Sequence, residues 1–192
     1  MLQLFISLIV FYAVHSILAA TCVKRWAGVQ LGLVRWYRLL YNMQSLVLFA
    51  WVCSAYWGND ARTIYSFTNM FVQGVGWALV VAGAMLVMVA VLRLGGAGFI
   101  GLMPEGSTGL VRSGIHGRVR HPIYSGIILA AVGWLLLSFT LSTLLVVGIT
   151  FLYLPIGMHL EERKLIALFG DEYLNYRQGV PALIPRLGRP RV

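Results

Sequence analysis

The sequence predicts an all-α integral membrane protein with about five transmembrane helices, folded as a single membrane domain over residues 1–192. Hydrophobic residues make up 59% of the chain and charged residues only 11%, whereas a soluble domain carries about 25% charged residues. Five mostly apolar segments each approach the roughly 20 residues that a helix needs to cross a bilayer core. Because a spanning backbone must satisfy its own polar groups inside lipid, we expect these segments to be helices.

The expected helices follow one another along the chain. Three occupy residues 2–20, 39–57 and 72–93 of an N-terminal part (1–93), and two occupy 122–138 and 142–160 of a C-terminal part (94–192). No basic residue precedes the first helix, as a signal peptide would require, so we expect it to be retained. The last two helices are separated only by Ser138 to Leu141 and should form a hairpin. A glycine-rich loop (94–121) and a tail (161–192) remain, and long ordered segments of this kind are usually functional.

The basic residues sort to one side of this arrangement. Of the 15 Lys and Arg residues, only Arg62 falls in the second loop, and the other 14 lie around the first and third loops and in the tail. The positive-inside rule then predicts an outside N-terminus and a cytoplasmic C-terminus. The small size of the chain favours a prokaryotic inner membrane. The net charge of +9 is therefore attributed to membrane topology, and no nucleic-acid partner is predicted, because the charges form short blocks between apolar segments.

The first group of candidate site residues is Arg120-His121-Pro122-Ile123-Tyr124, at the predicted start of the fourth helix. Pro122 suits a first helical turn, since its missing N–H would be unpaired there. A helix N-terminus offers free N–H groups and positive dipole character, which favour a bound carboxylate, and Arg120 and His121 add further donors. An ordinary basic flank at the membrane interface is the alternative.

The second group is Glu161-Glu162, expected at the end of the fifth helix. Carboxylates at a helix C-terminus oppose the macrodipole, so a cation or a donor-rich group is expected to compensate. A solvated acidic pair bridging to Arg163 and Lys164 is the alternative. The two predicted helices are roughly 27 and 30 Å long, so a hairpin returns the acidic pair to the cytoplasmic membrane surface beside the first group.

The tail supplies the third group. Tyr173 and Tyr176 lie three residues apart and so share one face of a predicted amphipathic helix. An extended stretch with Val180-Pro181 and Ile184-Pro185 follows. The two tyrosines are suited to packing on an adenine or to anchoring the helix at the membrane interface, and anchoring is favoured for each taken singly.

Three other patterns indicate no site. Gly96-Ala97-Gly98-Phe99-Ile100-Gly101 matches the dinucleotide-binding pattern, but that pattern requires a preceding strand, and here an apolar helix precedes it. Cys22 and Cys53 have no metal-ligand spacing, and no metal site is predicted. His159 lies near the acidic pair, where an interfacial histidine is the simpler interpretation.

The three groups belong to a longer series of short blocks between residues 110 and 186. In chain order they are Leu110-Val111, Gly114-Ile115, Arg120-His121-Pro122, Tyr124, Gly126, Glu161-Glu162, Phe169-Gly170, Glu172-Tyr173, Tyr176, Val180-Pro181 and Ile184-Pro185. This series resembles the isoprenylcysteine carboxyl methyltransferase superfamily, which also includes phospholipid methyltransferases and small bacterial relatives. His116 departs from the family, which often has tyrosine after the Gly-Ile pair, and this leaves the local loop contacts open.

The resemblance implies a cofactor, S-adenosyl-L-methionine, held between the last two helices and the cytoplasmic tail. It implies that His121 and Tyr124 help to bind the cofactor, that Glu161 and Glu162 lie near cofactor or substrate, and that Arg120 acts in catalysis. In the N-terminal half, His15-Ser16-Ile17-Leu18-Ala19 and Arg38-Leu39-Leu40-Tyr41-Asn42, with Phe99-Ile100-Gly101-Leu102 later, resemble the bacterial branch that includes methanethiol methyltransferases and NnrU-type proteins. A prenylated protein substrate is therefore not assumed.

The resulting hypothesis is a membrane-embedded methyltransferase that acts on a lipophilic or small acceptor within the bilayer. The predicted catalytic residues are Arg120 and Glu162, and the predicted cofactor-binding residues are His121, Pro122, Tyr124, Glu161, Tyr173 and Tyr176. A carboxylate acceptor of the isoprenylcysteine type, the leading family interpretation, is already ionised, and Arg120 would orient it. A thiol or amine acceptor, including a phospholipid amine, would instead need Glu161 or Glu162 as a base.

Two interpretations of other kinds stay open. One is a membrane reductase, because integral sterol reductases resemble this architecture. The other is a non-catalytic membrane scaffold or transport accessory. The oligomeric state is not predicted.

Overall fold

The computed structural model describes residues 1–31, 36–59, 62–95 and 109–186. The helices in chain order are α1 (Leu2–Ala19), α2 (Thr21–Leu31), α3 (Tyr37–Trp57), α4 (Met70–Arg93), the 3₁₀ helix η1 (Gly114–Gly117), α6 (Pro122–Leu137), α7 (Leu141–Phe169) and α8 (Asp171–Gly179). Two short strands, β1 (Thr63–Tyr65) and β2 (Phe139–Thr140), pair antiparallel.

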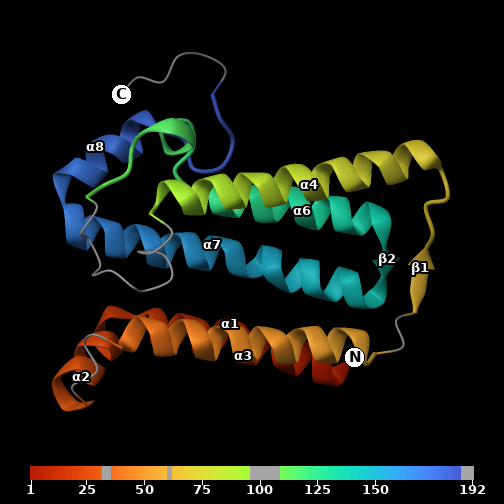
Figure 1. Cartoon of the computed structure of the whole chain (residues 1–192), viewed down its shortest axis with the longest axis horizontal. Helices are drawn as coiled ribbons and strands as arrows, with labels where there is room; N and C mark the ends of the chain where they lie inside the picture. Colours follow the sequence, from red (N-terminus) through yellow and green to blue (C-terminus); the bar gives the residue numbers. More distant parts are fainter. Residues whose placement is uncertain (32–35, 60–61, 96–108, 187–192) are drawn as a thin grey trace.

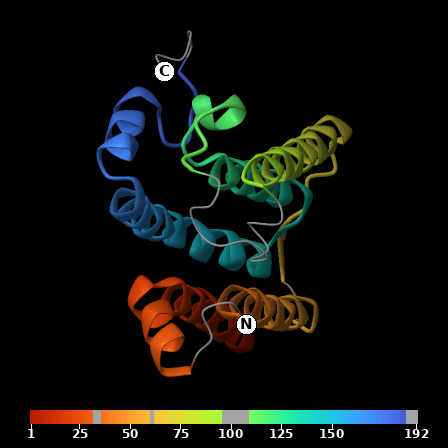
Figure 2. The same cartoon turned by 60° about the vertical axis from the view of Figure 1, so that its left-hand side comes forward.

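The long helices α1, α3, α4, α6 and α7 run side by side, and successive ones alternate in direction (Figure 1). Helices α2 and α8 and the η1 turn gather at one end of the bundle, the α8 end, and β1 and β2 lie at the other, the strand end. Figure 2 shows the arrangement in depth, with α7 between an α4–α6 pair and an α1–α3 pair. The N-terminus lies at the strand end and the C-terminus at the α8 end (Figure 1).

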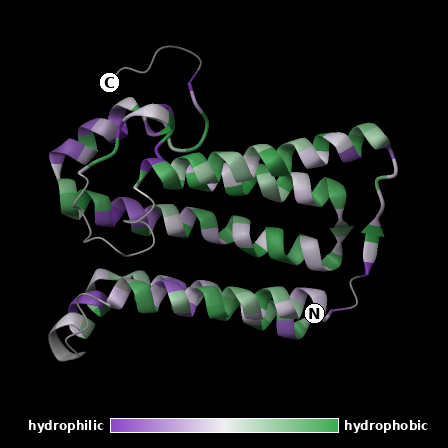
Figure 3. Cartoon of the chain, in the orientation of Figure 1, coloured by the Kyte–Doolittle hydropathy of each residue, from purple (hydrophilic) through white to green (hydrophobic). Residues whose placement is uncertain are grey.

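Four of these helices are long and apolar enough to cross a membrane. The spans are Leu2–Ala19, Leu39–Trp57, Met70–Arg93 and Leu141–Phe169. Helix α6 is also apolar, but its 16 residues rise only about 24 Å, less than the roughly 30 Å of a bilayer core. Hydrophilic residues concentrate at the α8 end (Figure 3). The prediction of an all-α, multi-pass membrane protein is confirmed, and the predicted fourth helix is present but shorter than a full span.

Two expectations about the helices are wrong. Helix α7 continues to Phe169, so Glu161 and Glu162 lie inside a helix and do not oppose the dipole of its end. The residues after the pair are mostly Leu, Ile, Ala, Arg and Lys, which sustain a helix, and the helix stops at Gly170, whose φ of 54° strains residues with a side chain. The predicted first loop also contains a helix that was not expected, α2.

The α4–α6 pair packs through glycines. A Cβ atom added at Gly83 would lie 2.5 Å from the carbonyl oxygen of Gly126, and one added at Gly133 would lie 2.6 Å from that of Gly76. Small residues allow the backbones of membrane helices to approach this closely. The contact holds the start of α6, where the first group of candidate residues lies, against α4.

Helix α7 is joined to the α1–α3 pair by an apolar cluster and by hydroxyl groups. Leu4, Leu8, Val52 and Ala55 of α1 and α3 are buried together, and Leu145, Val146 and Ile149 of α7 pack against them. Hydrogen bonds connect Tyr12 to Thr150 (2.8 Å), Ser16 to Tyr153 (2.9 Å) and Tyr56 to Thr143 (2.9 Å). Such bonds across membrane helices contribute about 1 kcal/mol each, so they orient the N-terminal helices against α7.

Candidate active site

The start of α6 is clamped by the tail that follows α8. The backbone N–H of Arg120 donates to the Pro181 carbonyl (2.8 Å), and that of His121 donates to the Ala182 carbonyl (3.0 Å). The Ser125 hydroxyl donates to the Leu183 carbonyl at 2.7 Å. The predicted extended stretch is therefore packed along the first turn of α6. These two N–H groups immediately precede the helix, and the tail carbonyls occupy them.

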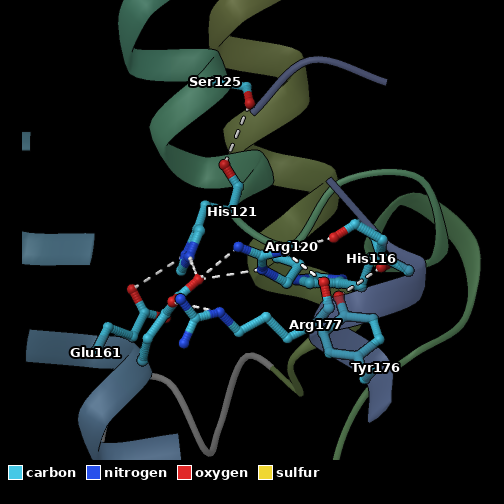
Figure 4. Close-up of polar contacts among 9 residues, drawn as sticks. His116, Arg120, His121, Ser125, Glu161, Tyr176 and Arg177 are labelled. Atoms are coloured by element: carbon cyan, nitrogen blue, oxygen red, sulfur yellow. Dashed lines mark hydrogen bonds and ion pairs between the residues drawn. The ribbon is translucent and has the colours of Figure 1, made fainter. Parts of the chain in front are cut away.

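Glu162 joins three elements at this point. Its Oε1 accepts hydrogen bonds from Nε and Nη2 of Arg120 at 3.1 and 2.8 Å, and it lies 3.1 Å from Nε2 of His121. Its Oε2 lies 3.4 Å from Nε of Arg177 on α8. The Glu162 side chain is only 13% exposed. Figure 4 shows the side chains of Arg120, His121 and Arg177 pointing toward one another.

All three guanidinium nitrogens of Arg120 donate hydrogen bonds in this cluster. Besides Glu162, its Nη1 donates to the backbone carbonyls of Arg177 (2.9 Å) and Val180 (2.6 Å). One guanidinium therefore links the start of α6 to α7 and to the end of α8. The hairpin geometry predicted from helix lengths is confirmed, since the Arg-His pair and the acidic pair meet at one end of the bundle.

Glu161 lies in different surroundings. Its side chain is 46% exposed, and its Oε2 lies 3.7 Å from Nδ1 of His121, too far for a hydrogen bond. The Tyr124 hydroxyl interacts with the same carboxylate. Glu161 is thus more exposed and less closely paired than Glu162.

The tyrosines of α8 are buried. Tyr173 and Tyr176 are 1% and 5% exposed, and they pack with Val180 against Leu110 and Phe169. The Tyr176 hydroxyl donates to the backbone carbonyl of His116 at 2.6 Å. The favoured interpretation of these tyrosines as membrane-interface anchors is therefore wrong, because an anchor exposes its ring to the headgroups.

A cavity of about 120 Å³ opens among these elements. Its walls are Leu94, Gly109, Leu110, Val111, His116, Arg120, His121, Pro122, Ile123, Tyr124, Glu161, Leu165, Phe169, Tyr173 and Tyr176. All the predicted site residues except Glu162 line it. His116 was missed as a site residue, although its position between Gly-Ile and Arg120 in the motif series was the available signal. His159 is exposed and lies outside the cavity walls, and the glycine pattern of 96–101 falls outside the described residues.

Unpaired polar atoms concentrate around this cavity. In the described parts of the chain, four buried side-chain polar atoms lack a hydrogen-bond partner, and three of them are His116 Nδ1, His121 Nδ1 and the Tyr173 hydroxyl. Because buried polar groups are nearly always hydrogen-bonded, three such atoms on the walls of one cavity indicate that it receives a polar ligand.

Burial and the two carboxylates act in opposite directions on the histidines. Burial alone lowers the pKa of His121, but Glu161 and Glu162 outweigh it, so the pKa of His121 is raised above its usual value. For His116 burial prevails, and its pKa is lowered. Burial raises the pKa of Tyr176 to about 12. At neutral pH the cavity therefore presents a neutral His116 and neutral tyrosines.

Known proteins resemble the chain over nearly its whole length. A family model described as "NnrU protein" matches residues 3–182. A methanethiol S-methyltransferase from Crocosphaera subtropica is 28% identical over 191 residues, covering 94% of this chain and 72% of that protein. Methanethiol S-methyltransferase 2 from Bradyrhizobium diazoefficiens is 30% identical over 182 residues, covering 90% of this chain and 68% of that protein.

A relative with another named activity matches a shorter stretch. The protein-S-isoprenylcysteine O-methyltransferase of Schizosaccharomyces pombe is 40% identical over 77 residues, which is 40% of this chain and 33% of that protein. No solved structure matches the chain. The family model covers all of the cavity walls and, except for Leu2, all five long helices, and on this evidence the chain belongs to the NnrU family.

Proposed function

We propose that the protein is an integral membrane methyltransferase that uses S-adenosyl-L-methionine and methylates a small thiol. The observation that carries the proposal is the cavity at the α8 end, which is lined by Glu161 and by the three residues with unpaired buried polar atoms. The relatives that match nearly the whole chain are named methanethiol S-methyltransferases, which favours a thiol acceptor over a carboxylate.

The chemistry of the walls fits this cofactor. S-Adenosylmethionine carries a sulfonium and an ammonium, and the Glu161 carboxylate is a suitable partner for either cation. It also carries polar groups that can hydrogen-bond to the unpaired atoms of His116, His121 and Tyr173. Phe169 supplies an aromatic wall, suited to an adenine. The cavity of about 120 Å³ is smaller than the roughly 300–1,000 Å³ of small-molecule sites, so we expect binding to widen it.

The two glutamates are proposed to have separate roles. When bound, the cofactor supplies an electrophilic methyl carbon to the acceptor sulfur. Thiols attack as thiolates, so Glu161, which faces the cavity, is placed to take the thiol proton. Glu162 faces Arg120 and His121, and its contacts favour positioning. Arg120 and Glu162, predicted as catalytic, are proposed to hold α6, α7 and α8 at the correct spacing around the methyl group.

A carboxylate acceptor of the isoprenylcysteine type is the second candidate. It is favoured by the 77-residue match to the isoprenylcysteine O-methyltransferase of S. pombe. A carboxylate needs no base, so at saturating cofactor the loss of Glu161 would affect this reaction much less than thiol methylation.

The test uses purified protein in detergent and S-adenosylmethionine with a radiolabelled methyl group. We expect labelled dimethyl sulfide from methanethiol, and calorimetric binding of S-adenosylhomocysteine that is weakened in Glu161→Gln. Label transferred to farnesylcysteine but not to methanethiol would select the second candidate. A folded protein that binds no S-adenosylhomocysteine would support the non-catalytic scaffold.

We also propose that the protein lies in a prokaryotic inner membrane with its α8 end, and therefore the cavity, in the cytoplasm. The described basic residues of the first loop, Lys24 and Arg25, lie in α2 at the α8 end, whereas Arg62 precedes β1 at the strand end (Figure 1). This distribution follows the positive-inside rule. The cofactor would then enter from the compartment in which it is made.

A further inference from the structure

Tyr124 forms the wall of the cavity that faces the interior of the bundle. Among the lining residues on α6, which begin at the first turn, Tyr124 lies furthest along the helix. On α7, Glu161 is the lining residue nearest the membrane interior. The next turn of α7 toward the interior contains Gly157, which is buried and does not line the cavity.

The Tyr124 side chain reaches across to this turn of α7. A Cβ atom added at Gly157 would lie 3.0 Å from the Tyr124 hydroxyl oxygen and 3.4 Å from its ring carbon Cε1. The hydroxyl also interacts with Glu161, one helical turn away. The ring thus spans the gap between α6 and α7 directly beneath the proposed base, and the absence of a side chain at Gly157 makes room for it.

A second ring closes the space beyond Tyr124. Cε1 of Tyr153, one turn further along α7, would lie 3.3 Å from the same added Cβ atom. The Tyr153 hydroxyl is hydrogen-bonded to Ser16 of α1 at 2.9 Å, and its ring stacks on Tyr12 with centroids 4.2 Å apart. Tyr153 is therefore held by α1, whereas Tyr124 lines the cavity.

We infer that Tyr124, seated against Gly157, determines the size of the methyl acceptor, admitting a short-chain thiol and excluding a long alkyl chain. The inference rests on the proposed thiol methylation. A thiol whose sulfur lies at Glu161 has its carbon chain directed away from the cofactor methyl group, and Tyr124 blocks the route between α6 and α7 into the bundle. Sterically closed pockets discriminate strongly against larger groups, since extra atoms have no space to occupy.

The first experiment compares acceptors of increasing chain length, from methanethiol to dodecanethiol, in wild type, Tyr124→Ala and Tyr124→Phe. We expect wild type and Tyr124→Phe to favour the shortest thiols, because both keep the ring. Tyr124→Ala should shift the ratio of kcat/KM for dodecanethiol over methanethiol upward by about tenfold or more, within the range by which pockets discriminate.

The second experiment uses a smaller change and a matched control. Gly157→Ala places a methyl group against Tyr124, whereas Gly148→Ala adds one on the same helix with nothing within 4 Å. We expect Gly157→Ala to raise KM for methanethiol about tenfold, as small misplacements at a reaction centre do, with affinity for S-adenosylhomocysteine changed less than about twofold. Gly148→Ala should match wild type in both.

The outcomes separate the inference from the proposed function. If wild type methylates no thiol, the proposed function fails and the inference with it. If wild type methylates methanethiol but the chain-length ratio is the same in Tyr124→Ala, the inference alone is wrong. Should Tyr124→Ala not fold, the Gly157→Ala variant tests the inference. An unchanged KM for methanethiol in that variant would contradict an acceptor-side role for Tyr124, and so would equal losses of affinity for cofactor and acceptor.

Discussion

Glu161 and Glu162 are adjacent along α7 but face different partners. Successive residues of an α-helix point about 100° apart, so one carboxylate faces the cavity and the other faces the Arg120 cluster. Glu162 has two arginines and a histidine within 3.4 Å, whereas Glu161 has only His121 at 3.7 Å among its ion pairs in the described parts of the chain. Neutralising the two carboxylates, one at a time, should therefore have different effects on the protein.

Neutralising Glu162 should chiefly destabilise the fold, and neutralising Glu161 should chiefly stop the reaction. Glu162→Gln leaves Arg120 and Arg177 short of a counter-charge. We expect a loss of about 2 kcal/mol, less than the 3–5 kcal/mol for fully buried pairs, because Glu162 is 13% exposed. Glu161→Gln should keep the melting temperature and reduce thiol methylation about 100-fold or more, in line with general-base contributions.

Thermal unfolding in detergent and single-turnover methylation assays measure the two effects separately. Equal melting temperatures for the two variants, with equal activities, would contradict the division of roles.

The raised pKa of His121 predicts a dependence of stability on pH. Burial opposes the charged ring, but Glu161 and Glu162 stabilise it more strongly. A histidine whose pKa is raised in the folded state contributes its full stabilisation at pH values below its pKa in the unfolded state, about 6.5. This stabilisation is lost as the pH rises through the pKa in the folded state. We expect the melting-temperature difference between wild type and His121→Asn to be largest near pH 6 and to shrink as the pH rises.

His159→Asn is the control for this measurement, because His159 lies on α7 nearby and is exposed. Its melting-temperature difference from wild type should be small at every pH. A His121 difference that grows with pH would show that burial, rather than the carboxylates, decides the state of the ring.

At the scale of elements, the glycine contact between α4 and α6 sets the position of the site. Gly83 and Gly126 bring the two backbones together, and α6 begins one turn before Gly126 with the residues that line the cavity. Helix α7, by contrast, contacts its neighbours mainly through larger side chains and hydroxyls. The contact between α4 and α6 at these glycines therefore leaves no room for added volume.

A single methyl group should be enough to test this contact. Gly83→Ala places Cβ 2.5 Å from the Gly126 carbonyl oxygen, so the helices must separate, and overpacking of this kind costs about 1–3 kcal/mol. Gly74→Ala, on the same helix with nothing within 4 Å, should be neutral. Thermal unfolding in detergent compares the two, and equal stability would mean that the helices adjust without cost.

At the scale of the whole molecule, the helices separate two chemically different ends. The α8 end holds α2, η1, α8 and the cavity, and the strand end holds the β1–β2 pair and the N-terminus (Figures 1 and 3). In a bilayer these two ends face opposite compartments.

The native cysteines allow this orientation to be measured. Cys22 is exposed at the start of α2, at the α8 end. In a Cys53→Ser background, we expect a membrane-impermeant maleimide to leave Cys22 unlabelled in intact spheroplasts and to label it after permeabilisation. With both native cysteines replaced by serine, Thr63→Cys at the strand end should be labelled in intact spheroplasts. The reverse pattern would invert the proposed topology.

The membrane class, the approximate positions of the long helices and the meeting of the Arg-His pair with the acidic pair could all be predicted from the sequence. These follow from apolar length, basic flanks and the rise of a helix, which are local properties of the chain. The same local properties misplaced the end of α7, because the apolar stretch that marks a membrane span stops before Glu161, whereas the helix-forming residues continue to Phe169.

Four other features follow from tertiary packing and could not be predicted: Glu161 rather than Glu162 lines the cavity, the tail occupies the N–H groups before α6, the α8 tyrosines are buried, and Tyr124 rests against Gly157. Each of these depends on a partner distant in sequence, such as Arg120 for Glu162 or Leu110 for Tyr173. Burial and pairing are set by how helices pack together, and a pattern of residue types along one helix does not specify the side chains that the next helix will present to it.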